Sequence, residues 1–137
     1  MQPFHLAFPV HDLAAARAFY GDLLGCPEGR SSAGWVDFDF HGHQIVAHLA
    51  PAELTEAVTN DVDGEQVPCR HFGLVLDIAG FHDLVSRIQQ GGGTFLIDPQ
   101  VRFEGEPGEQ RTFFILDPSG NALEFKAFAD PDQLFAT

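Results

Sequence analysis

The sequence predicts an α+β fold made of two βαβββ modules whose sheets curve into a shared, incomplete mixed-sheet barrel around a cavity. Three observations support this prediction: a repeated half, apolar patterns that switch between strand and helix, and a turn signature before the final strand. The 137 residues, 45% of them hydrophobic, suffice for one domain with a real core. We expect a single domain over residues 1–137, with module one at about 1–50, a linker at about 51–68 and module two at about 69–130.

The repeat relates two stretches, "HLAFPVHDLAAARAFYGDLLG" and "HFGLVLDIAGFHDLVSRIQQG". Both open on a histidine, continue through an apolar run and an aspartate, and stop on a glycine. From His5 to Gly25 is 20 positions, and from His71 to Gly91 is also 20. One half of this size could not cover both faces of its own sheet, so the two halves are expected to pair.

The first strand of each module is expected to place bulky side chains on one face and a histidine with small neighbours on the other. The bulky residues are Phe4, Leu6, Phe8 and Val10 in residues 4–10, and Phe72, Leu74, Leu76 and Ile78 in residues 71–78. His5 shares its face with Ala7, and His71 shares its face with Gly73. Each imidazole therefore has open space beside it.

A helix is predicted to follow each first strand. In module one Asp12 is a suitable N-cap and Gly25 a suitable stop. The apolar stripes, with helical spacing, are Leu13, Ala16, Tyr20, Leu23 and Leu24 in the first helix, and Phe81, Leu84, Val85 and Ile88 in the second. We expect Tyr20 to belong to the core.

Further strands are predicted after each helix, at "WVDFDF" and "HQIVAHL" in module one and at "TFLI", "RTFFILD" and "NALEFKAF" in module two. The stretch "DPSGN" at 117–121 is a tight-turn signature that joins the last two strands as a hairpin. Residues 98–111, "DPQVRFEGEPGEQR", are expected to form a long mobile loop that could act as a lid.

Composition excludes several classes of partner. The formal charge of −13 repels phosphate backbones, which argues against nucleic acid and anionic membrane surfaces. The chain contains no apolar run near the roughly 20 residues of a bilayer span and no secretory signal, so the expected location is the cytoplasm. Cys26 and Cys69 stand alone, as expected of reduced thiols.

The combination of "AFYGDLLG" with the terminal "DPSGNALEF" resembles the vicinal oxygen chelate superfamily, which includes glyoxalase I, extradiol ring-cleaving dioxygenases, fosfomycin-resistance thiol transferases and bleomycin-binding proteins. The resemblance covers almost the whole chain, from Phe4 to Phe128. It implies metal ligands on the first and last strands of each module. Those positions are His5 and His71 on the first strands, Glu124 on the final strand and His48 on the last strand of module one.

Two imidazoles and one carboxylate also form, independently of any family, the arrangement that leaves open coordination positions on a divalent ion. We expect Fe(II) in first place, with Mn(II), Ni(II), Co(II) or Zn(II) as further options. Three roles are open for His48, which could be a fourth metal ligand, an acid/base group or a structural residue. Aligning Gly42 with Gly120 places Val46 rather than His48 opposite Glu124, and an insertion of two residues would be needed to restore the match.

The ligand set favours a dioxygenase-like enzyme that acts on a small, flat substrate with neighbouring oxygens. Phe114 and Trp35 would supply an apolar wall, although ordinary core or dimer contacts explain both residues equally well. Ring-cleaving relatives usually carry tyrosine at the position of Phe114, which counts against this assignment. Two alternatives are a glyoxalase-like lyase or isomerase acting on thiol adducts of ketoaldehydes and a metal-free drug-binding resistance protein. The resemblance also implies a homodimer, sometimes with exchanged modules.

Overall fold

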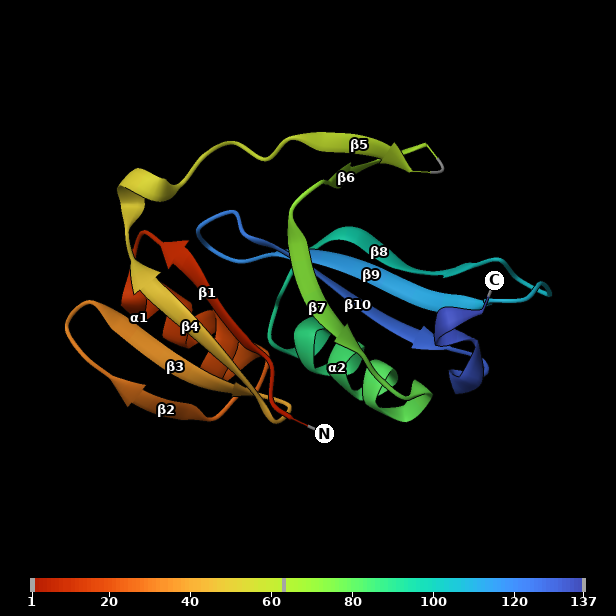
Figure 1. Cartoon of the computed structure of the whole chain (residues 1–137), viewed down its shortest axis with the longest axis horizontal. Helices are drawn as coiled ribbons and strands as arrows, with labels where there is room; N and C mark the ends of the chain where they lie inside the picture. Colours follow the sequence, from red (N-terminus) through yellow and green to blue (C-terminus); the bar gives the residue numbers. More distant parts are fainter. Residues whose placement is uncertain (1, 63, 137) are drawn as a thin grey trace. The chain divides into compact units, whose positions relative to one another are not determined.

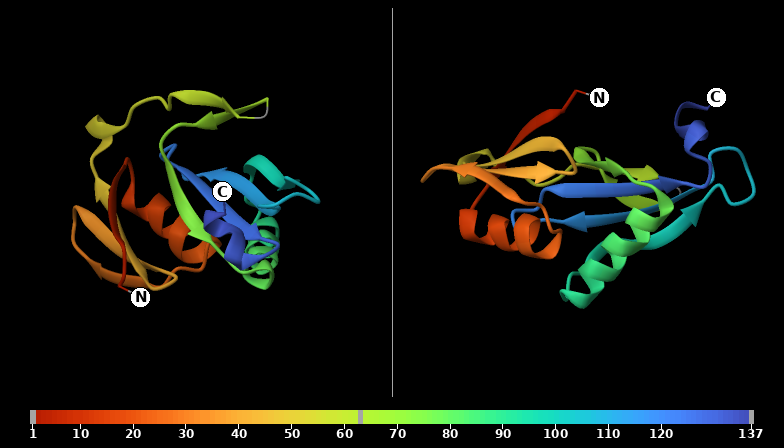
Figure 2. Two further views of the ribbon diagram at one scale, coloured as in Figure 1. Left: turned by 45° about the vertical axis from the view of Figure 1, so that its right-hand side comes forward. Right: turned by 90° about the horizontal axis from the view of Figure 1, so that it is seen from below.

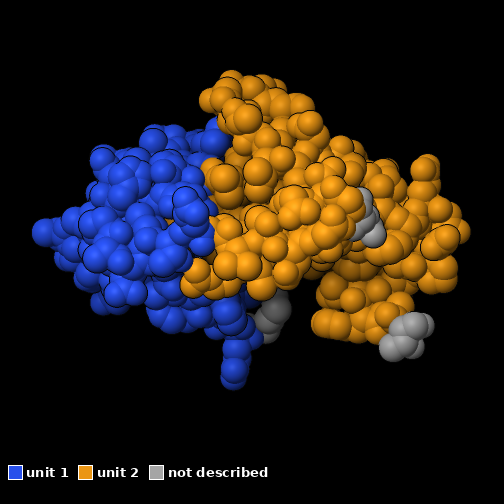
Figure 3. All heavy atoms as spheres, turned by 90° about the horizontal axis from the view of Figure 1, so that it is seen from above, with its two compact units in different colours: residues 1–56, 117–120 blue, residues 57–116, 121–137 orange. Residues whose placement is uncertain are grey.

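The computed structural model describes residues 2–62 and 64–136, which divide into two compact units (Figure 3). The first unit comprises residues 1–56 and 117–120, and the second comprises residues 57–116 and 121–137. Each unit contains one four-stranded mixed sheet, so the predicted α+β class is confirmed. Among the described residues, no helix has the length and apolar character that a membrane span requires.

The first unit contains, in chain order, β1 (His5–Val10), α1 (Leu13–Ala16), η1 (Arg17–Leu23), β2 (Glu28–Ser31), β3 (Trp35–Phe40), β4 (His43–Leu49) and η2 (Pro51–Glu53). Its sheet has the strand order β1-β4-β3-β2, with β1 parallel to β4 and the other pairs antiparallel. The helical segment α1–η1 covers one face of this sheet (Figure 1). The predicted βαβββ order is therefore present in this half of the chain.

The second unit contains β5 (Thr59–Val62), β6 (Glu65–Pro68), β7 (His71–Val75), α2 (Ile78–Gln90), β8 (Phe95–Arg102), β9 (Gln110–Leu116), β10 (Ala122–Phe128) and η3 (Pro131–Phe135). Its main sheet repeats the order of the first, as β7-β10-β9-β8, and α2 lies along one face (Figure 2). A separate hairpin, β5–β6, packs Val62 and Val67 against Ile97 and Phe114 of this sheet. The segment expected as a linker thus contributes a hairpin to the second unit.

The helix predicted after β1 begins as expected but changes type. Asp12 caps it by accepting a hydrogen bond from the Ala15 amide, and after one α-helical turn it continues as a π-helix to Leu23. The wider turns move Phe19 into the core, whereas Leu23 is only half-buried. The predicted apolar stripe, which included Leu23 and left out Phe19, was wrong at these two residues because it assumed the period of an α-helix.

Tyr20 is fully buried, which confirms its expected place in the core. Its hydroxyl donates a 2.8 Å hydrogen bond to Oδ2 of Asp117, in the turn between β9 and β10. Burial, reinforced by the Asp117 carboxylate, raises the pKa of Tyr20 well above 10. The turn itself has the predicted hairpin form, with Gly120 at φ 83° and its amide bonded to the Asp117 carbonyl.

Two predicted boundaries in the second half were wrong. β7 ends at Val75 rather than continuing to residue 78, because Asp77 caps α2 by accepting a hydrogen bond from the Gly80 amide. The loop expected over residues 98–111 is shorter, since β8 runs to Arg102 and β9 begins at Gln110. β8 pairs with β9 at residues 100–102, which turn residues in the sequence had suggested would be irregular, and the register shifts between Ile97 and Gln100.

Candidate functional site

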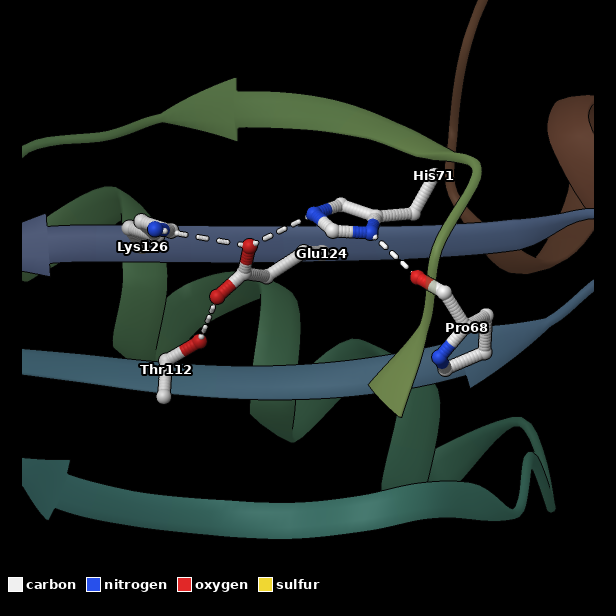
Figure 4. A network of polar contacts seen from close by, with 5 residues as sticks. All are labelled: Pro68, His71, Thr112, Glu124 and Lys126. Carbon is white, nitrogen blue, oxygen red and sulfur yellow. Dashed lines mark hydrogen bonds and ion pairs between the residues drawn. The ribbon is translucent and has the colours of Figure 1, made fainter. Parts of the chain in front are cut away.

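A buried carboxylate stands at the centre of the polar network on the second sheet. Glu124 of β10 is only 8% exposed, and three side chains surround it (Figure 4). Thr112 donates a 2.8 Å hydrogen bond to Oε1, while Oε2 lies 3.2 Å from Nε2 of His71 and 3.4 Å from Nζ of Lys126. A charge buried to this degree requires such partners. The network therefore holds both carboxylate oxygens in fixed positions.

The sheet register explains why these side chains meet. Glu124 and Lys126 are two residues apart on β10, so their side chains point to the same face. Thr112 is the direct cross-strand partner of Lys126 on that face, and His71 lies on β7, the parallel neighbour of β10. The network therefore follows from strand alternation and pairing.

Gly73 allows β7 to approach β10 closely beside this network. It pairs with Glu124, and a Cβ atom built at Gly73 would lie 1.6 Å from the Glu124 carbonyl oxygen. No side chain fits that space. The small residue next to His71, which the sequence suggested would leave room for the imidazole, in fact makes room for the neighbouring backbone.

The hydrogen bonds of His71 define its tautomer. Its Nδ1 lies 2.7 Å from the Pro68 carbonyl oxygen, which can only accept, so Nδ1 carries the proton (Figure 4). In a neutral imidazole Nε2 then holds a lone pair, and this nitrogen faces Oε2 of Glu124. The ring also makes an edge contact with Phe114, with 5.2 Å between ring centroids. Two acceptors that face each other in this way need a shared proton or cation.

The spacing of these two acceptors suits a metal ion. Ligands bound at about 2.1 Å in adjacent positions at right angles lie about 3.0 Å apart. Nε2 of His71 and Oε2 of Glu124 are separated by 3.2 Å. One nitrogen and one oxygen donor are also the types that Fe(II), Mn(II), Ni(II), Co(II) and Zn(II) accept. The pair thus fits two adjacent positions on a divalent ion.

The first unit carries the other candidate residues. His5 on β1 is exposed, and its Nδ1 lies 2.8 Å from Oε1 of Gln44 on β4. Nε2 of Gln44 donates in turn to Oδ2 of Asp37 at 2.9 Å. His48 and Trp35 are direct partners on β4 and β3, with His48 exposed and Trp35 half-buried. All five side chains belong to one face of the first sheet.

The register bears directly on His48. Ala7 pairs with Val46 in the first sheet as Gly73 pairs with Glu124 in the second, so Val46 occupies the position equivalent to Glu124. β1 and β4 pair without a shift from His5 to Val10, so the pairing contains no two-residue insertion. The role of His48 stays a prediction, and it rests on the shared sheet face rather than on equivalence to Glu124.

A cavity of about 230 Å³ opens within the second unit, between the β5–β6 hairpin and the main sheet. It adjoins the Glu124 network, because Thr112 and Phe114 belong to both. The rest of its lining is Val62, Glu65, Val67, Ile97, Gln100, Val101, Arg102 and Phe103. Phe103 has a left-handed backbone, at φ 56°, and the Arg102 guanidinium lies over its ring. The lining is mainly apolar, and its Thr112 is hydrogen-bonded to the Glu124 carboxylate.

The structure thus brings two of the predicted ligands, His71 and Glu124, into contact within the second unit. His5, His48 and Trp35 lie in the first unit. Among the described residues, neither unit on its own gathers three histidine, cysteine, aspartate or glutamate side chains around one metal position.

Sequence reasoning missed the residues that support these candidates. Lys126 could have been found from its spacing of two from Glu124 on the same strand. Thr112 and Asp37 become visible only through cross-strand pairing, which a single sequence does not specify. The Pro68 carbonyl carries no side-chain signal at all.

Two βαβββ modules with the same strand order define a vicinal oxygen chelate fold. The sequence matches the family model of the Glyoxalase/Bleomycin resistance protein/Dioxygenase superfamily over residues 2–125, and the chain therefore belongs to this superfamily. This result confirms the predicted resemblance. The superfamily contains enzymes as well as resistance proteins without catalytic activity.

A glyoxalase/bleomycin resistance protein/dioxygenase from Alicyclobacillus acidocaldarius is similar in structure, at 36% identity and a TM-score of 0.84 over 98% of this chain and 96% of that chain. The genomically encoded fosfomycin resistance protein FosX from Listeria monocytogenes shares the fold, at 18% identity and a TM-score of 0.72 over 97% of each chain. Virulence protein STM3117 of Salmonella typhimurium is 25% identical over 124 residues, which are 90% of this chain and 82% of that protein.

Proposed function

We propose that the chain is a metal-dependent enzyme, dioxygenase-like in its ligand set, in which His71, Glu124 and a His5 side chain hold one divalent ion. The observation that carries the proposal is the 3.2 Å separation between the lone-pair nitrogen of His71 and Oε2 of Glu124. A fixed nitrogen–oxygen pair at this spacing, beside a cavity, suits a site that keeps coordination positions open. Fe(II) is the favoured ion, with Mn(II), Ni(II), Co(II) or Zn(II) as alternatives.

The third ligand, His5, would come from a module of the first kind, either in the same chain or in a second copy. We propose a homodimer because proteins of this fold often form dimers, with residues 1–137 acting as one functional domain. The family match over residues 2–125 supports treating both modules as parts of one site. In a homodimer with exchanged modules, each complete site would combine His5 of one copy with His71 and Glu124 of the other.

When bound by these residues, a divalent ion would supply Lewis-acid chemistry that lowers the pKa of neighbouring substrate oxygens and would allow activation of dioxygen. The protein groups would do the rest. Thr112 holds one oxygen of Glu124, so that the other faces His71. Phe114 and Phe103 line the cavity and would bind the apolar body of a small substrate. His48, exposed on its sheet face, would move a proton to or from the substrate.

One observation favours a second candidate, a glyoxalase-like lyase or isomerase. Phe114 lies against His71 where a proton-donating tyrosine would serve ring cleavage, and a phenyl ring cannot donate a proton. Such an enzyme would use the same ligands with Ni(II) or Zn(II). It would act on thiol adducts of ketoaldehydes without consuming oxygen.

The test is reconstitution with each metal followed by two assays. Protein loaded with Fe(II) is tested for oxygen consumption with a panel of catechols, and protein loaded with Ni(II) or Zn(II) for isomerisation of hemithioacetals under nitrogen. Glu124→Gln, which keeps the shape but removes the charge, serves as the matched control. Turnover that depends on both metal and Glu124 supports the proposal, and the active assay selects between the two reactions. Equal turnover by metal-free protein or by Glu124→Gln contradicts it.

A further inference from the structure

We infer that Gln44 and Asp37 are positioning residues that set the tautomer of His5, leaving Nε2 as the nitrogen with the free lone pair. The inference concerns the metal-free protein. Its consequence for metal affinity rests on the proposed function, in which His5 is a ligand. Four observations support it: the orientation of the Gln44 amide, the hydrogen bond between Gln44 and His5, the sheet register and the contrast with module two.

The first step is the orientation of the Gln44 amide. Asp37 is 93% buried on β3, and its Oδ2 lies 2.9 Å from Nε2 of Gln44. An ionised carboxylate accepts hydrogen bonds and does not donate them. The amide must therefore turn its NH₂ group toward Asp37, which leaves its carbonyl oxygen on the side of His5.

The second step is the proton on His5. Oε1 of Gln44 lies 2.8 Å from Nδ1 of His5, and an amide oxygen only accepts. Nδ1 must therefore carry the hydrogen, so a neutral His5 ring presents an unprotonated Nε2. That is the form in which imidazole binds a metal ion through Nε2.

The strand register holds together the relay of hydrogen bonds that runs from His5 through Gln44 to Asp37. His5 pairs directly with Gln44 across the parallel strands β1 and β4, so the two side chains share one face of the sheet. Asp39 is the direct partner of Gln44 on β3, but its carboxylate already accepts the Gly42 amide in the β3–β4 turn. Asp37, two residues along the same strand and face, is left to receive the amide.

The fourth step is the contrast between modules. The position equivalent to Gln44 in the second sheet is Ala122, which pairs with His71 and has no polar side chain. There the Pro68 carbonyl accepts from Nδ1 of His71 instead. The two modules reach the same tautomer by different routes, so a change at Gln44 should affect His5 and leave His71 unchanged.

The expected consequence follows from the exposure of His5 to water. A solvated neutral imidazole prefers the hydrogen on Nε2, the form that cannot bind a metal through that atom. Without the relay, only a minor fraction of His5 would be ready to bind, and the apparent Kd for a metal rises as the inverse of that fraction. Loss of such supporting hydrogen bonds typically weakens metal binding by about 10-fold to 100-fold.

The test is a two-bond ¹H–¹⁵N correlation spectrum of the metal-free full chain, at a pH of about 8.5, some two units above the reference imidazole pKa. Each neutral histidine shows which nitrogen carries the hydrogen. We expect Nδ1–H for His5 and His71 in the native protein. In Gln44→Leu, His5 should change to mainly Nε2–H while His71 does not change. Gln44→Glu should keep Nδ1–H at His5, because a carboxylate still accepts from it.

The exposed Gln90→Leu exchange serves as the control for a general loss of polarity, and backbone amide spectra verify that every variant is folded. Nε2–H at His5 in the native protein, or an unchanged His5 in Gln44→Leu, overturns the inference. Co(II) titration separates it from the proposed function. A chain that binds no metal but shows the tautomer change keeps the relay and refutes the metal site. Metal binding through His5 that is equally strong in Gln44→Leu refutes the role of the relay alone.

Discussion

Replacing Gly73 with alanine should disrupt the second sheet at the point where the candidate site is formed. The added Cβ would lie 1.6 Å from the Glu124 carbonyl oxygen and 2.6 Å from its carbonyl carbon. Both are backbone atoms of β10, so no side-chain rotation relieves the overlap. An ordinary contact of about 3.4 Å is reached only after the strands separate by about 1.8 Å, the difference between the two distances.

A separation of this size breaks the hydrogen bonds of the ladder near Gly73. Two backbone bonds at about 1 kcal/mol each, added to about 1–3 kcal/mol for overpacking, give a loss of about 3–5 kcal/mol in the free energy of unfolding. The gap between Nε2 of His71 and Oε2 of Glu124 would grow from 3.2 Å to about 5 Å. That gap is too wide for adjacent ligands of one ion, so metal affinity should fall together with stability.

The loss of stability is measured by urea unfolding monitored by circular dichroism. The loss of metal affinity is measured by isothermal titration calorimetry with Co(II), under conditions in which the variant is folded. Gly34→Ala is the matched control, because a Cβ added there would have its nearest neighbouring atom 4.0 Å away and the backbone is not left-handed. We expect that control to change stability by less than about 0.5 kcal/mol. A Gly73→Ala variant as stable as Gly34→Ala would refute the packing argument.

Three further predictions concern the polar networks. Tyr20→Phe should cost about 1.5–3 kcal/mol near neutral pH, because Asp117 loses its 2.8 Å donor. The raised pKa keeps Tyr20 neutral in the folded state, whereas the tyrosine of the unfolded chain ionises near pH 10. The free energy of unfolding of the native protein should therefore fall as pH rises above 10. Denaturant unfolding should show the difference in stability between the native protein and Tyr20→Phe becoming smaller there. Lys126→Met should strengthen Co(II) binding about threefold to tenfold at low salt, because an ammonium 3.4 Å from Oε2 of Glu124 opposes a cation; weaker binding would contradict this. Thr112→Val should destabilise the fold by about 1.5–3 kcal/mol, whereas Thr112→Ser, which keeps the hydroxyl, should recover most of the loss in thermal or urea unfolding.

The repeat in the sequence predicted the modular fold because it is encoded in local patterns. Alternation in the first strands, the aspartate cap and the glycine stop are each properties of short segments, and all of them appear in the structure. The π-helical turns of η1 did not follow from pattern, because residues 12–25 also match an ordinary helical stripe. Phe19 and Tyr20 are both buried in the structure, and the local pattern did not indicate that both would face the core.

The candidate site also combines residues that the sequence could predict with residues that it could not. His71 could be named from the sequence because it stands at the repeat position of His5, and Glu124 because the resemblance to the superfamily implied a ligand on the final strand. Two of their supporting groups, Thr112 and the Pro68 carbonyl, could not, since they reach the site through cross-strand pairing and the path of the chain before β7. The Gln44 amide is significant only in the register that sets it between His5 and Asp37.

The most direct test of the central claim is metal stoichiometry in protein purified without chelator and then titrated with Co(II), followed by visible absorption and elemental analysis. The account predicts one ion per chain for the native protein. His71→Ala and Glu124→Ala, which each remove one member of the 3.2 Å donor pair, should lose that ion, and so should His5→Ala. A native chain that binds no ion, or variants that bind one ion as tightly as the native chain, would contradict the account.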